Sequence, residues 1–246
     1  MTNRALIIAA GATSLSVIRG ALASRDSDLM ADALRTLGCE VDVDGSTVTV
    51  RPGPVTGGGR VDCGLAGTVM RFVPPVAALS ATPTLIGGDQ AARRRPMSTM
   101  TDALVQLGAH VEGETLPMTV SGPITGGTAR IDSSASSQFV SGLLLSGARF
   151  PAGVTVIHTG DSVPSLPHIE MTLDMLRTAG VESTQHHDEE TGTYSWTVPH
   201  QEYAGGEVTI EPDLSNAAAF LAAAAVTGGH VSVPGWPATT TQPGDD

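Results

Sequence analysis

The sequence contains no lysine. All of its 13 basic residues are arginine, and they stand against 25 acidic residues, for a net charge of −12. This absence excludes Schiff-base chemistry, pyridoxal-phosphate catalysis on the chain's own lysine and P-loop nucleotide binding, because each needs an amine. The acidic balance argues against a nucleic-acid partner or an anionic membrane surface, since both require a basic footprint. A codon bias that writes arginine for lysine is the simplest origin of the absence.

Cysteine and long apolar runs are also scarce. The two cysteines, Cys39 and Cys63, are too few for a metal cluster, and Cys39 fits a small, reduced core position. The longest apolar run, Ala217 to Val226, is too short and too rich in alanine to span a bilayer, and no secretory signal opens the chain. A chain of 246 residues buries enough surface to need no metal or disulfide. We therefore expect a cytoplasmic protein that contacts no membrane.

The clearest positive feature is an internal repeat. An amphipathic stretch with apolar residues at helical spacing occurs three times and runs up to Gly38, Gly108 and Gly180, about 70 residues apart. Each stretch predicts a helix with one solvated face, and each glycine is placed just beyond a helix end.

A second, more apolar helix alternates with the first. Its copies begin near Asn3, Gly67, Ser137 and Ser215. Two of these helices, Phe139 to Leu145 and Ala217 to Val226, are apolar nearly all round, which is typical of buried helices. The strands expected to follow the four copies are Leu15 to Ile18, Pro83 to Ile86, Val154 to Ile157 and His230 to Val233.

The repeats predict an α/β fold of three βαβαββ-type units over residues 1–204, followed by a fourth half-unit over residues 205–246. Each unit places one buried helix, so we expect these helices to pack on a shared axis with the sheets outside them. This arrangement is the reverse of a TIM barrel, in which parallel strands line the centre.

Polar segments precede several of the predicted helices. At such places free backbone amides and the positive end of the helix dipole bind anions. A serine before a helix is usually only an N-cap, so caps alone remain an alternative, but Ser136, Ser137 and Gln138 exceed what one cap needs. The four segments are Thr2–Leu6, Gly64–Arg71, Ser133–Phe139 and Ser165–Ile169.

Arginines accompany these segments. Arg93–Pro96 holds a basic triplet in an acidic protein, and guanidinium groups bind phosphate and carboxylate in a bidentate manner. Such a run is otherwise a solvated face, but Pro96 favours an extended Arg95 directly before a helix. Arg4 and Arg71 hold the corresponding place in two other repeats. The sequence therefore predicts a pocket for a polyanionic small molecule.

Other motifs carry less. His186–Glu190 has metal-ligand residue types, but neighbouring side chains diverge, and the segment is typical of a hairpin tip. Gly57–Gly59 lacks a following lysine and predicts a turn. Gly-x-Ser-x-Gly, His-Glu-x-x-His and Cys-x-x-Cys are absent from the sequence.

Taken together, these segments resemble the 5-enolpyruvylshikimate-3-phosphate synthase (3-phosphoshikimate 1-carboxyvinyltransferase) family. The likeness runs end to end in the family's order, through Asn3–Leu6, Gly64–Arg71, Arg95–Met97, Ser136–Phe139, Pro164–Ile169 and Glu211–Ser215. The resemblance implies two domains, each an inside-out α/β barrel of three repeats, with residues 205–246 as the first half-unit of the second domain. It also implies transfer of the enolpyruvyl group of phosphoenolpyruvate to the 5-hydroxyl of shikimate 3-phosphate, a step toward chorismate and the aromatic amino acids, without cofactor or metal.

The resemblance further implies roles for individual residues. His168 stands where the family has a tyrosine beside the shikimate ring, and Arg71 is expected to support the loop that holds Gly67. The residues expected to bind phosphoenolpyruvate are Gly67, Arg95 and Gln138. Those expected to bind shikimate 3-phosphate are Arg4, Ser136, Ser137, Gln138, Ser165 and His168.

Two parts of the family pattern are expected outside the chain. The Pro-Gly-Ser-Lys-Ser motif would lie directly before Met1, and the second domain, with its catalytic aspartate, would follow Thr241. We therefore expect no catalytic residue within the chain, negligible activity of the chain alone and an exposed apolar patch on the helix Ala217 to Val226. The full-length protein is expected to be a monomer.

Two alternatives to this function stay open. UDP-N-acetylglucosamine enolpyruvyl transferases share the fold and the donor, but they carry a reactive cysteine near the position of Arg95, whereas Cys39 and Cys63 lie elsewhere. The Ser136–Gln138 triplet also favours shikimate 3-phosphate. A non-catalytic anion-binding domain, or an inactive gene fragment, is the other alternative.

Overall fold

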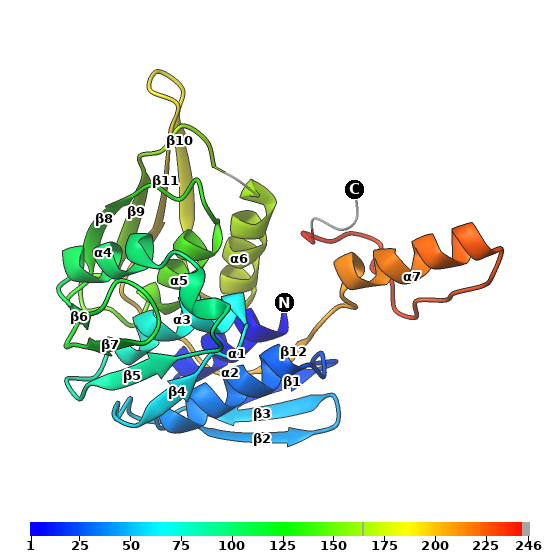
Figure 1. Cartoon of the computed structure of the whole chain (residues 1–246), viewed down its shortest axis with the longest axis horizontal. Helices are drawn as coiled ribbons and strands as arrows, with labels where there is room; N and C mark the ends of the chain where they lie inside the picture. The colour runs from blue at the N-terminus through cyan, green and yellow to red at the C-terminus, as the bar shows by residue number, and fades with distance from the viewer. Residues whose placement is uncertain (164, 243–246) are drawn as a thin grey trace.

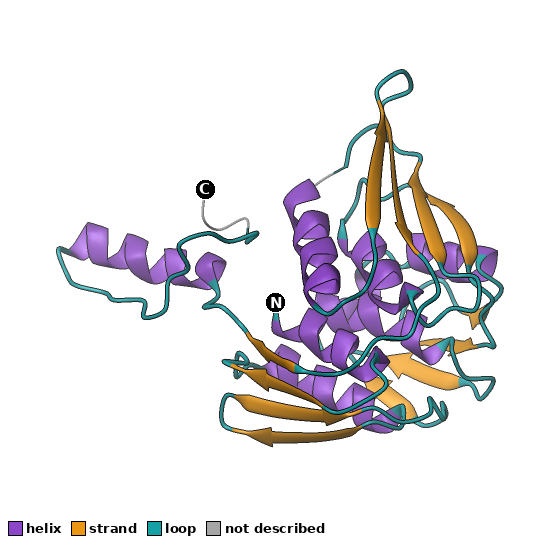
Figure 2. Ribbon diagram, turned by 180° about the vertical axis from the view of Figure 1, so that it is seen from behind, coloured by secondary structure: helices purple, strands orange, loops and turns teal. Residues whose placement is uncertain are grey.

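The computed structural model of the chain describes residues 1–163 and 165–242. Within them, three four-stranded sheets surround a group of helices, and one further helix stands apart from this body (Figure 1). Seen from behind, the sheets again lie on the outside with helices between them (Figure 2). The mixed α/β architecture with outer sheets and inner helices agrees with the sequence prediction.

Three units follow one another along the chain. The first contains α1 (Thr2–Gly11), β1 (Ser16–Arg19), α2 (Arg25–Thr36), β2 (Glu40–Asp44) and β3 (Thr47–Arg51). The second contains β4 (Arg60–Asp62), α3 (Gly67–Ala77), β5 (Thr84–Gly87), the 3-10 turn η1 (Ala92–Arg94), α4 (Ser98–Gln106), β6 (His110–Glu112) and β7 (Met118–Ser121). The third contains β8 (Gly127–Ile131), α5 (Gln138–Gly147), β9 (Val154–His158), α6 (Leu166–Thr178), β10 (Thr184–Asp188) and β11 (Thr193–Val198). The last elements are β12 (Glu207–Thr209) and α7 (Leu214–Thr227).

The three sheets share one topology. Their strand orders are β12-β1-β3-β2, β4-β5-β7-β6 and β8-β9-β11-β10. In each sheet the first two strands pair in parallel and the other pairs are antiparallel. β12 thus holds in the first sheet the place that β4 and β8 hold in the others. The sheet therefore includes Glu207–Thr209, beyond the expected domain boundary at residue 204.

The apolar helices α1, α3 and α5 form the centre and pack against one another. Phe72 of α3 and Phe139 of α5 have no exposed surface, and residues 139–147 are all buried. Close packing of α5 on α3 needs the glycine at position 142, because an added Cβ there would lie 2.3 Å from the Arg71 carbonyl oxygen. The prediction of buried helices on a shared axis is confirmed.

The amphipathic helices α2, α4 and α6 cover the outside of this centre. Each is followed by a glycine in the left-handed region, with φ of +109° at Gly38, +92° at Gly108 and +81° at Gly180. A residue with a Cβ is strained at such angles, so glycine is the natural stop. The three helix ends predicted from the repeat are therefore confirmed.

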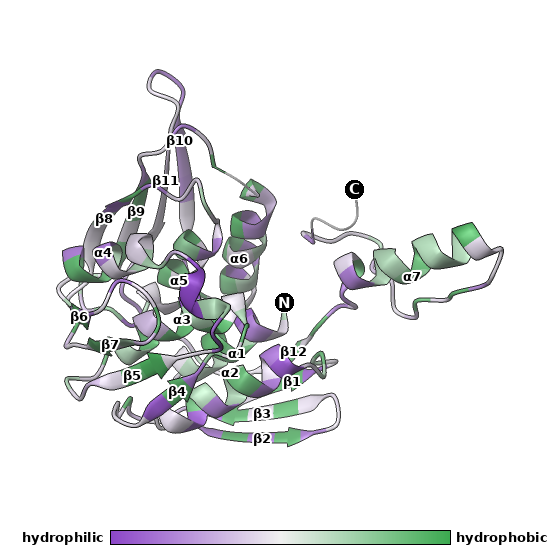
Figure 3. Cartoon of the chain, viewed as in Figure 1, coloured by the Kyte–Doolittle hydropathy of each residue, from purple (hydrophilic) through white to green (hydrophobic). Residues whose placement is uncertain are grey.

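The C-terminal helix α7 departs from the pattern. Figure 3 shows it as an apolar helix well away from the body. Within it Leu214 and Ala217 are buried, whereas Phe220 is 66% exposed and Val226 87% exposed. The expectation that this helix is buried is wrong for this structure, because α1, α3 and α5 already fill the centre. The expected exposed apolar patch is confirmed.

One predicted strand is also wrong. Residues 230–233, expected to form a strand after the fourth helix, are irregular. A strand needs a neighbour to satisfy its backbone donors and acceptors, and none of the described strands lies beside this segment. Across the part of the chain that the structure describes, no helix combines the length and apolar character needed to cross a bilayer.

Candidate anion-binding site

The N-terminal ends of four helices meet at one end of the centre. The Asn3 Nδ2 of α1 donates to the Thr68 Oγ1 of α3 at 2.7 Å. From α3, the Arg71 Nη1 donates to the Gln138 Oε1 of α5 at 3.2 Å. The Arg4 Nη2 of α1 donates to the His168 carbonyl oxygen of α6 at 3.3 Å. The repeated segments picked out by sequence are thus brought together in space.

These four helix ends lack the side-chain caps that begin α2 and α7, and α4 lacks one as well. Ser24 caps α2 in a reciprocal capping box, and Asp213 caps α7. No side-chain cap is present at α1, α3, α5 or α6, although Ser137 and Ser165 hold the N-cap positions of the last two. Uncapped first-turn amides at the positive end of a helix dipole are donors for an anion. The alternative that these serines are only caps therefore fails for Ser137 and Ser165.

Ser136 has a local bond of its own. Its hydroxyl accepts the Gln138 backbone N–H at 3.2 Å, a short-range bond that serines before helices often form. The cap interpretation thus holds in part for Ser136. Ser137 beside it is buried, so the two hydroxyls lie in different surroundings at the start of α5.

Arg4 is a buried cation without an anionic partner. Its Nε donates to the Thr172 Oγ1 at 2.8 Å, and its guanidinium lies 5.4 Å from the centroid of the Phe72 ring. Burial lowers the pKa of Arg4 to about 10. Hydrogen bonds and a ring face satisfy the geometry of the guanidinium but do not neutralise its charge.

A second group of cations surrounds Gly67. A Cβ added at Gly67 would lie 3.1 Å from the Gln138 Oε1, 3.3 Å from the Arg71 Nη1 and 3.3 Å from the Arg95 Nη1. Arg71 is buried, and its pKa is lowered by burial and then by the nearby Arg95 charge. Arg95 has φ −78° and ψ 136°, the extended conformation that Pro96 predicts, and its Nη1 donates to the Leu65 carbonyl oxygen at 3.1 Å.

The repeat places the two buried arginines equivalently. Arg4 lies over Phe72, and Arg71 lies over Phe139 at 5.0 Å from the ring centroid. Each arginine therefore stacks on an aromatic ring of the next central helix. Gln138 directly precedes Phe139 as Arg71 precedes Phe72, so the third helix presents an amide where the other two present guanidiniums. The site thus has two cationic subsites and one neutral one.

Arg4, Arg71 and Arg95 form no ion pair within the part of the chain that the structure describes. Within the described ranges, the arginine ion pairs join Arg19 to Glu207, Arg25 to Asp89, Arg35 to Asp32 and Arg51 to Glu40. None of them includes Arg4, Arg71 or Arg95. Three buried polar atoms without a partner also lie here, namely Asn3 Oδ1, Arg71 Nε and His168 Nδ1. A buried, unpaired cation is costly in an apolar centre, and a bound anion would remove that cost.

The remaining predicted residues lie at the start of α6. Ser165 is exposed and adopts the left-handed conformation, with φ +53° and ψ 48°, which is uncommon outside glycine and is found at functional sites. His168 is half-buried, and its pKa is lowered by burial, by Arg4 and by the terminal amino group. Pro167 lies in the first helical turn, as expected. Pro164, the first residue of this motif, lies outside the described residues.

Sequence reasoning missed the supports of Arg4. Thr172 Oγ1 accepts from Arg4 and donates to the His168 carbonyl oxygen at 2.9 Å, and it lies 3.0 Å from the buried Ser141 Oγ, so it links the guanidinium to α5 and α6. The available signal was the spacing of Thr172, one helical turn after His168, and the presence of the Ser141 hydroxyl in the middle of the apolar helix α5. Neither signal shows by itself that the two residues meet.

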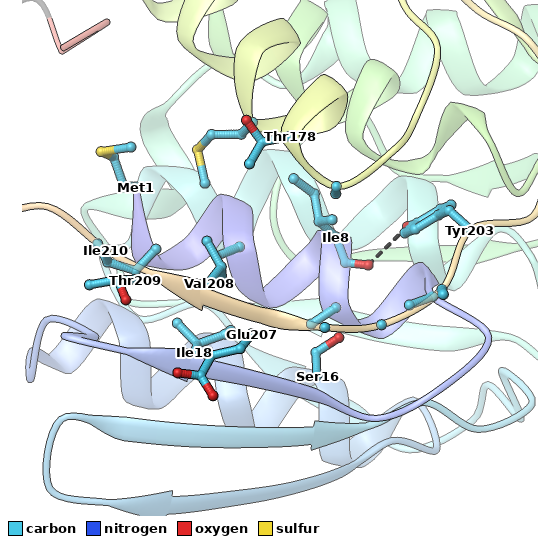
Figure 4. A pocket seen from close by; sticks show the side chains of 18 of the residues that line it. Met1, Ile8, Ser16, Ile18, Thr178, Tyr203, Glu207, Val208, Thr209 and Ile210 are labelled. Atoms are coloured by element: carbon cyan, nitrogen blue, oxygen red, sulfur yellow. Dashed lines mark hydrogen bonds between the residues drawn. The ribbon is translucent and has the colours of Figure 1, made fainter. Parts of the chain in front are cut away.

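One sizeable cleft lies away from the arginines. It measures about 340 Å³ and runs between α1, α6 and β12, where Tyr203 donates to the Ile8 carbonyl oxygen at 2.9 Å (Figure 4). Its lining holds no arginine but includes Asp174 and Glu207, so it does not suit an anion. A second hollow of about 330 Å³ is lined by Asn3, Arg4 and Thr68 at the helix ends, and also by the carboxyl-bearing residues Asp26, Glu211 and Asp213.

The weaker motifs are accounted for without chemistry. His187 lies in β10 and stacks on Tyr194 of β11 with ring centroids 4.1 Å apart, so the hairpin interpretation is confirmed. No cluster of three metal-ligating side chains forms among the residues described. Both cysteines are free and buried, and burial raises the pKa of Cys63 to about 12. Neither thiol is therefore a ready nucleophile.

Three equivalent units with their sheets outside the helices define a class of protein, the inside-out α/β domain, and here three arginines without an ion pair stand at its helix ends. The chain belongs to the EPSP synthase (3-phosphoshikimate 1-carboxyvinyltransferase) family, whose model matches residues 1–246. The predicted family is thereby confirmed.

Solved structures show the same fold. Two structures of EPSP synthase from Acinetobacter baumannii match with TM-scores of 0.71 and 0.69, at 23% and 24% sequence identity. The matches cover 92% of this chain but only 50% and 51% of those chains. The chain thus spans about half the length of these relatives.

Proposed function

We propose that the chain binds shikimate 3-phosphate and phosphoenolpyruvate as part of an enzyme that transfers the enolpyruvyl group of phosphoenolpyruvate to the 5-hydroxyl of shikimate 3-phosphate, releasing phosphate. Family membership supports the reaction. The observation that carries the binding proposal is the pair of buried arginines, Arg4 and Arg71, that have no carboxylate partner at the meeting of four helix ends.

The geometry supports a division of the site between the two substrates. The guanidiniums of Arg71 and Arg95 and the Gln138 Oε1 gather within 3.1–3.3 Å of where a Cβ would stand on Gly67. Two guanidiniums beside a glycine backbone suit the phosphate and carboxylate of phosphoenolpyruvate. Near Arg4, hydroxyls and His168 mix with one cation, which suits a polyhydroxylated ring that carries one phosphate. We assign shikimate 3-phosphate to Arg4, Ser136, Ser137, Gln138, Ser165 and His168.

The chemical step needs more than this cluster contains. Arginines, hydroxyls and an amide bind and orient anions, and arginines stabilise developing charge, but proton transfer requires an acid and a base with suitable pKa values. Among the residues that the structure describes, no carboxylate forms an ion pair with Arg4, Arg71 or Arg95, although Asp26, Glu211 and Asp213 line the same hollow as Arg4. We therefore propose that this chain alone binds substrate but turns it over negligibly.

The proposal also extends to the domain boundary, the class of ligand, the cellular compartment and the oligomeric state. The three-unit body extends through β12, so we place its boundary after Thr209, with later residues in a separate unit. The net charge of −12 supports a small-molecule ligand over a nucleic acid. Two unpaired, buried cysteines are in keeping with the reducing cytoplasm, where we propose that the full-length protein acts as a monomer.

Calorimetry with the 246-residue chain tests the binding proposal. Shikimate 3-phosphate should bind weakly, and Arg4→Gln should reduce the affinity by about ten- to a hundred-fold, the worth of a charge-assisted hydrogen bond. Arg149→Gln is the matched control, because the Arg149 Nη1 bonds the Gly11 carbonyl oxygen at the opposite end of α1. Its affinity should equal that of the parent chain.

Three results would contradict the proposal. Equal losses in the two variants would place the anion elsewhere. Stronger binding of UDP-N-acetylglucosamine than of shikimate 3-phosphate would favour the rival transferase. Steady-state phosphate release by the purified chain with both substrates would show that the chain alone is catalytically complete.

A further inference from the structure

His158 ends β9 inside the protein, with 4% of its surface exposed. Its Nδ1 accepts the Ser133 hydroxyl at 2.9 Å and the Ser133 backbone N–H at 3.3 Å. A backbone N–H can only donate, so Nδ1 carries no proton and the ring proton lies on Nε2. The histidine is therefore a neutral acceptor for both donors of one serine.

Ser133 begins the loop that carries the serines before α5. It has no exposed surface, and its carbonyl oxygen accepts the Ser136 N–H at 2.9 Å. The Ser136 hydroxyl in turn accepts the Gln138 N–H, and the Gln138 Oε1 accepts from Arg71. A continuous chain of hydrogen bonds thus joins the ring of His158 to the amide and guanidinium at the candidate site.

The second ring nitrogen of His158, Nε2, does not explain why a histidine occupies this position. His158 Nε2 is buried and finds no partner among the described residues, which is unfavourable for a polar atom. A purely apolar ring would avoid this cost if position 158 only filled space. The contact that distinguishes histidine from phenylalanine here is the one between Nδ1 and Ser133.

The other two sheets have no buried histidine at the position equivalent to His158. His158 pairs with Ile131 in the register between β9 and β8, and the equivalent positions are Gly87, opposite Asp62, and Arg19, opposite Thr209. Gly87 has no side chain, and the Arg19 guanidinium pairs with Glu207 on the surface. Only the third of these positions offers a buried acceptor to the loop beside it.

We propose that His158 is a positioning residue, which holds the Ser133–Gln138 loop so that Ser136, Ser137 and Gln138 face the bound anion. Its role in ligand binding rests on the proposed function. Its hold on the loop does not, because the hydrogen bonds are present in the chain without a ligand.

Amide hydrogen exchange followed by NMR tests the loop without any ligand. His158→Phe keeps a ring but removes the acceptor, and it should speed exchange at Ser136 and Gln138 by about tenfold or more relative to the β8 and β9 amides. His158→Asn places an acceptor oxygen near the position of Nδ1 and should restore protection. Should the phenylalanine variant fail to fold, Ser133→Ala breaks the same contact with less disturbance and should give the same local pattern.

The control is Ser146→Ala, which also removes a buried serine hydroxyl. Ser146 lies near the C-terminal end of α5, away from the loop, and its hydroxyl has no hydrogen-bond partner among the described residues. This substitution should leave exchange in the loop unchanged. The ring-nitrogen chemical shifts of His158 in the parent chain should show the Nε2–H tautomer. A protonated Nδ1, equal behaviour of the phenylalanine and asparagine variants, or uniform loss of protection over β8 and β9 would overturn the proposal.

Titration with shikimate 3-phosphate and with inorganic phosphate adds the functional readout. His158→Phe should weaken binding by about tenfold, and His158→Asn should recover most of it. If the parent chain binds neither probe while the loop exchange changes as expected, the proposed function fails and the structural role of His158 stands. If binding is intact in the phenylalanine variant while the loop is loosened, the role in anion binding is overturned.

Discussion

Helices α5 and α7 are copies of one repeat element, but α5 is buried and α7 is mostly exposed. Both are rich in small and apolar residues and carry no charge along their length. In α5 every residue from Phe139 to Gly147 is buried, whereas α7 buries only Leu214 and Ala217. Apolar composition therefore favours burial of a helix, but it does not decide whether other parts of the fold cover that helix.

Connectivity explains the difference. β4 leads into α3 and β8 leads into α5, and each helix then returns to a parallel neighbouring strand. β12 leads into α7 in the same way, but the central place beside β12 and β1 is taken by α1. Three sheets enclose three central places, and a fourth helix of the same type finds none free.

The largest expected contrast is a matched pair of leucine truncations. Leu143→Ala in α5 should cost about 2–5 kcal/mol of unfolding free energy, because Leu143 is wholly buried and a cavity would remain. Leu221→Ala in α7 should stay within about 0.5 kcal/mol of the parent, because Leu221 is 37% exposed and packs on little. Urea unfolding followed by circular dichroism measures both. Equal losses would mean that α7 is buried in solution.

Shortening the chain separates β12 from α7. A chain ending after Gly205 loses β12 and the buried Ile210 and should be less stable by about 1.5–3 kcal/mol. A chain ending after Ile210 keeps the first sheet complete and should keep the parent's stability. Both should aggregate less, because the exposed apolar helix is gone.

Urea unfolding and light scattering provide the measurements for the shortened chains. Phe220→Ser in the intact chain is the control, since it should reduce scattering without touching β12. Unchanged aggregation and unchanged stability of the chain ending after Gly205 would contradict both ideas at once.

A glycine substitution probes the close contact that α5 makes and α7 lacks. Gly142→Ala improves helix propensity by about 1 kcal/mol, but the new Cβ would meet the Arg71 carbonyl oxygen at 2.3 Å. We expect a net loss of about 1–3 kcal/mol from overpacking. Gly206→Ala, where an added Cβ meets no atom within 4 Å, should be neutral. A stabilised Gly142→Ala chain would show that α3 and α5 are further apart than described.

The smallest effect concerns the surface ion pair across β1 and β12. Arg19 and Glu207 are 52% and 57% exposed at their side chains, and exposed pairs of this kind contribute little. Arg19→Ala should leave the urea midpoint within experimental error at both low and high salt. A measurable loss that salt abolishes would mean that electrostatics, rather than backbone pairing, holds β12 in the sheet.

Much of the fold was predictable because it follows from short-range patterns. Helical spacing and a following glycine located α2, α4 and α6, since an amphipathic stripe and a left-handed stop are local properties. The missed strand at residues 230–233 was not predictable in this way, because a strand depends on a neighbour that only the fold provides. Membership of β12 in the first sheet was missed for the same reason.

The candidate site likewise contains residues that the sequence could predict and residues that it could not. Arg4, Arg71, Arg95 and the serine-rich loop could be predicted as anion-binding candidates from residue type alone, because cations and hydroxyls before helices favour anions in any fold. Their supports, Thr172, Ser141 and His158, lie far from their partners in sequence, and nothing local marks them. Whether the buried arginines lack a carboxylate is likewise a question of distances.

By itself, the sequence determined the repeat, the helix ends, the residue types available for an anion and the absence of any amine for lysine chemistry. Tertiary structure alone decided which of four similar helices are buried, which strand completes the first sheet and which side chains hold the arginines. The physical reason is that propensity, periodicity and charge are carried by neighbouring residues. Burial, strand pairing and ion pairing depend instead on groups that only the closed fold brings within a few ångströms.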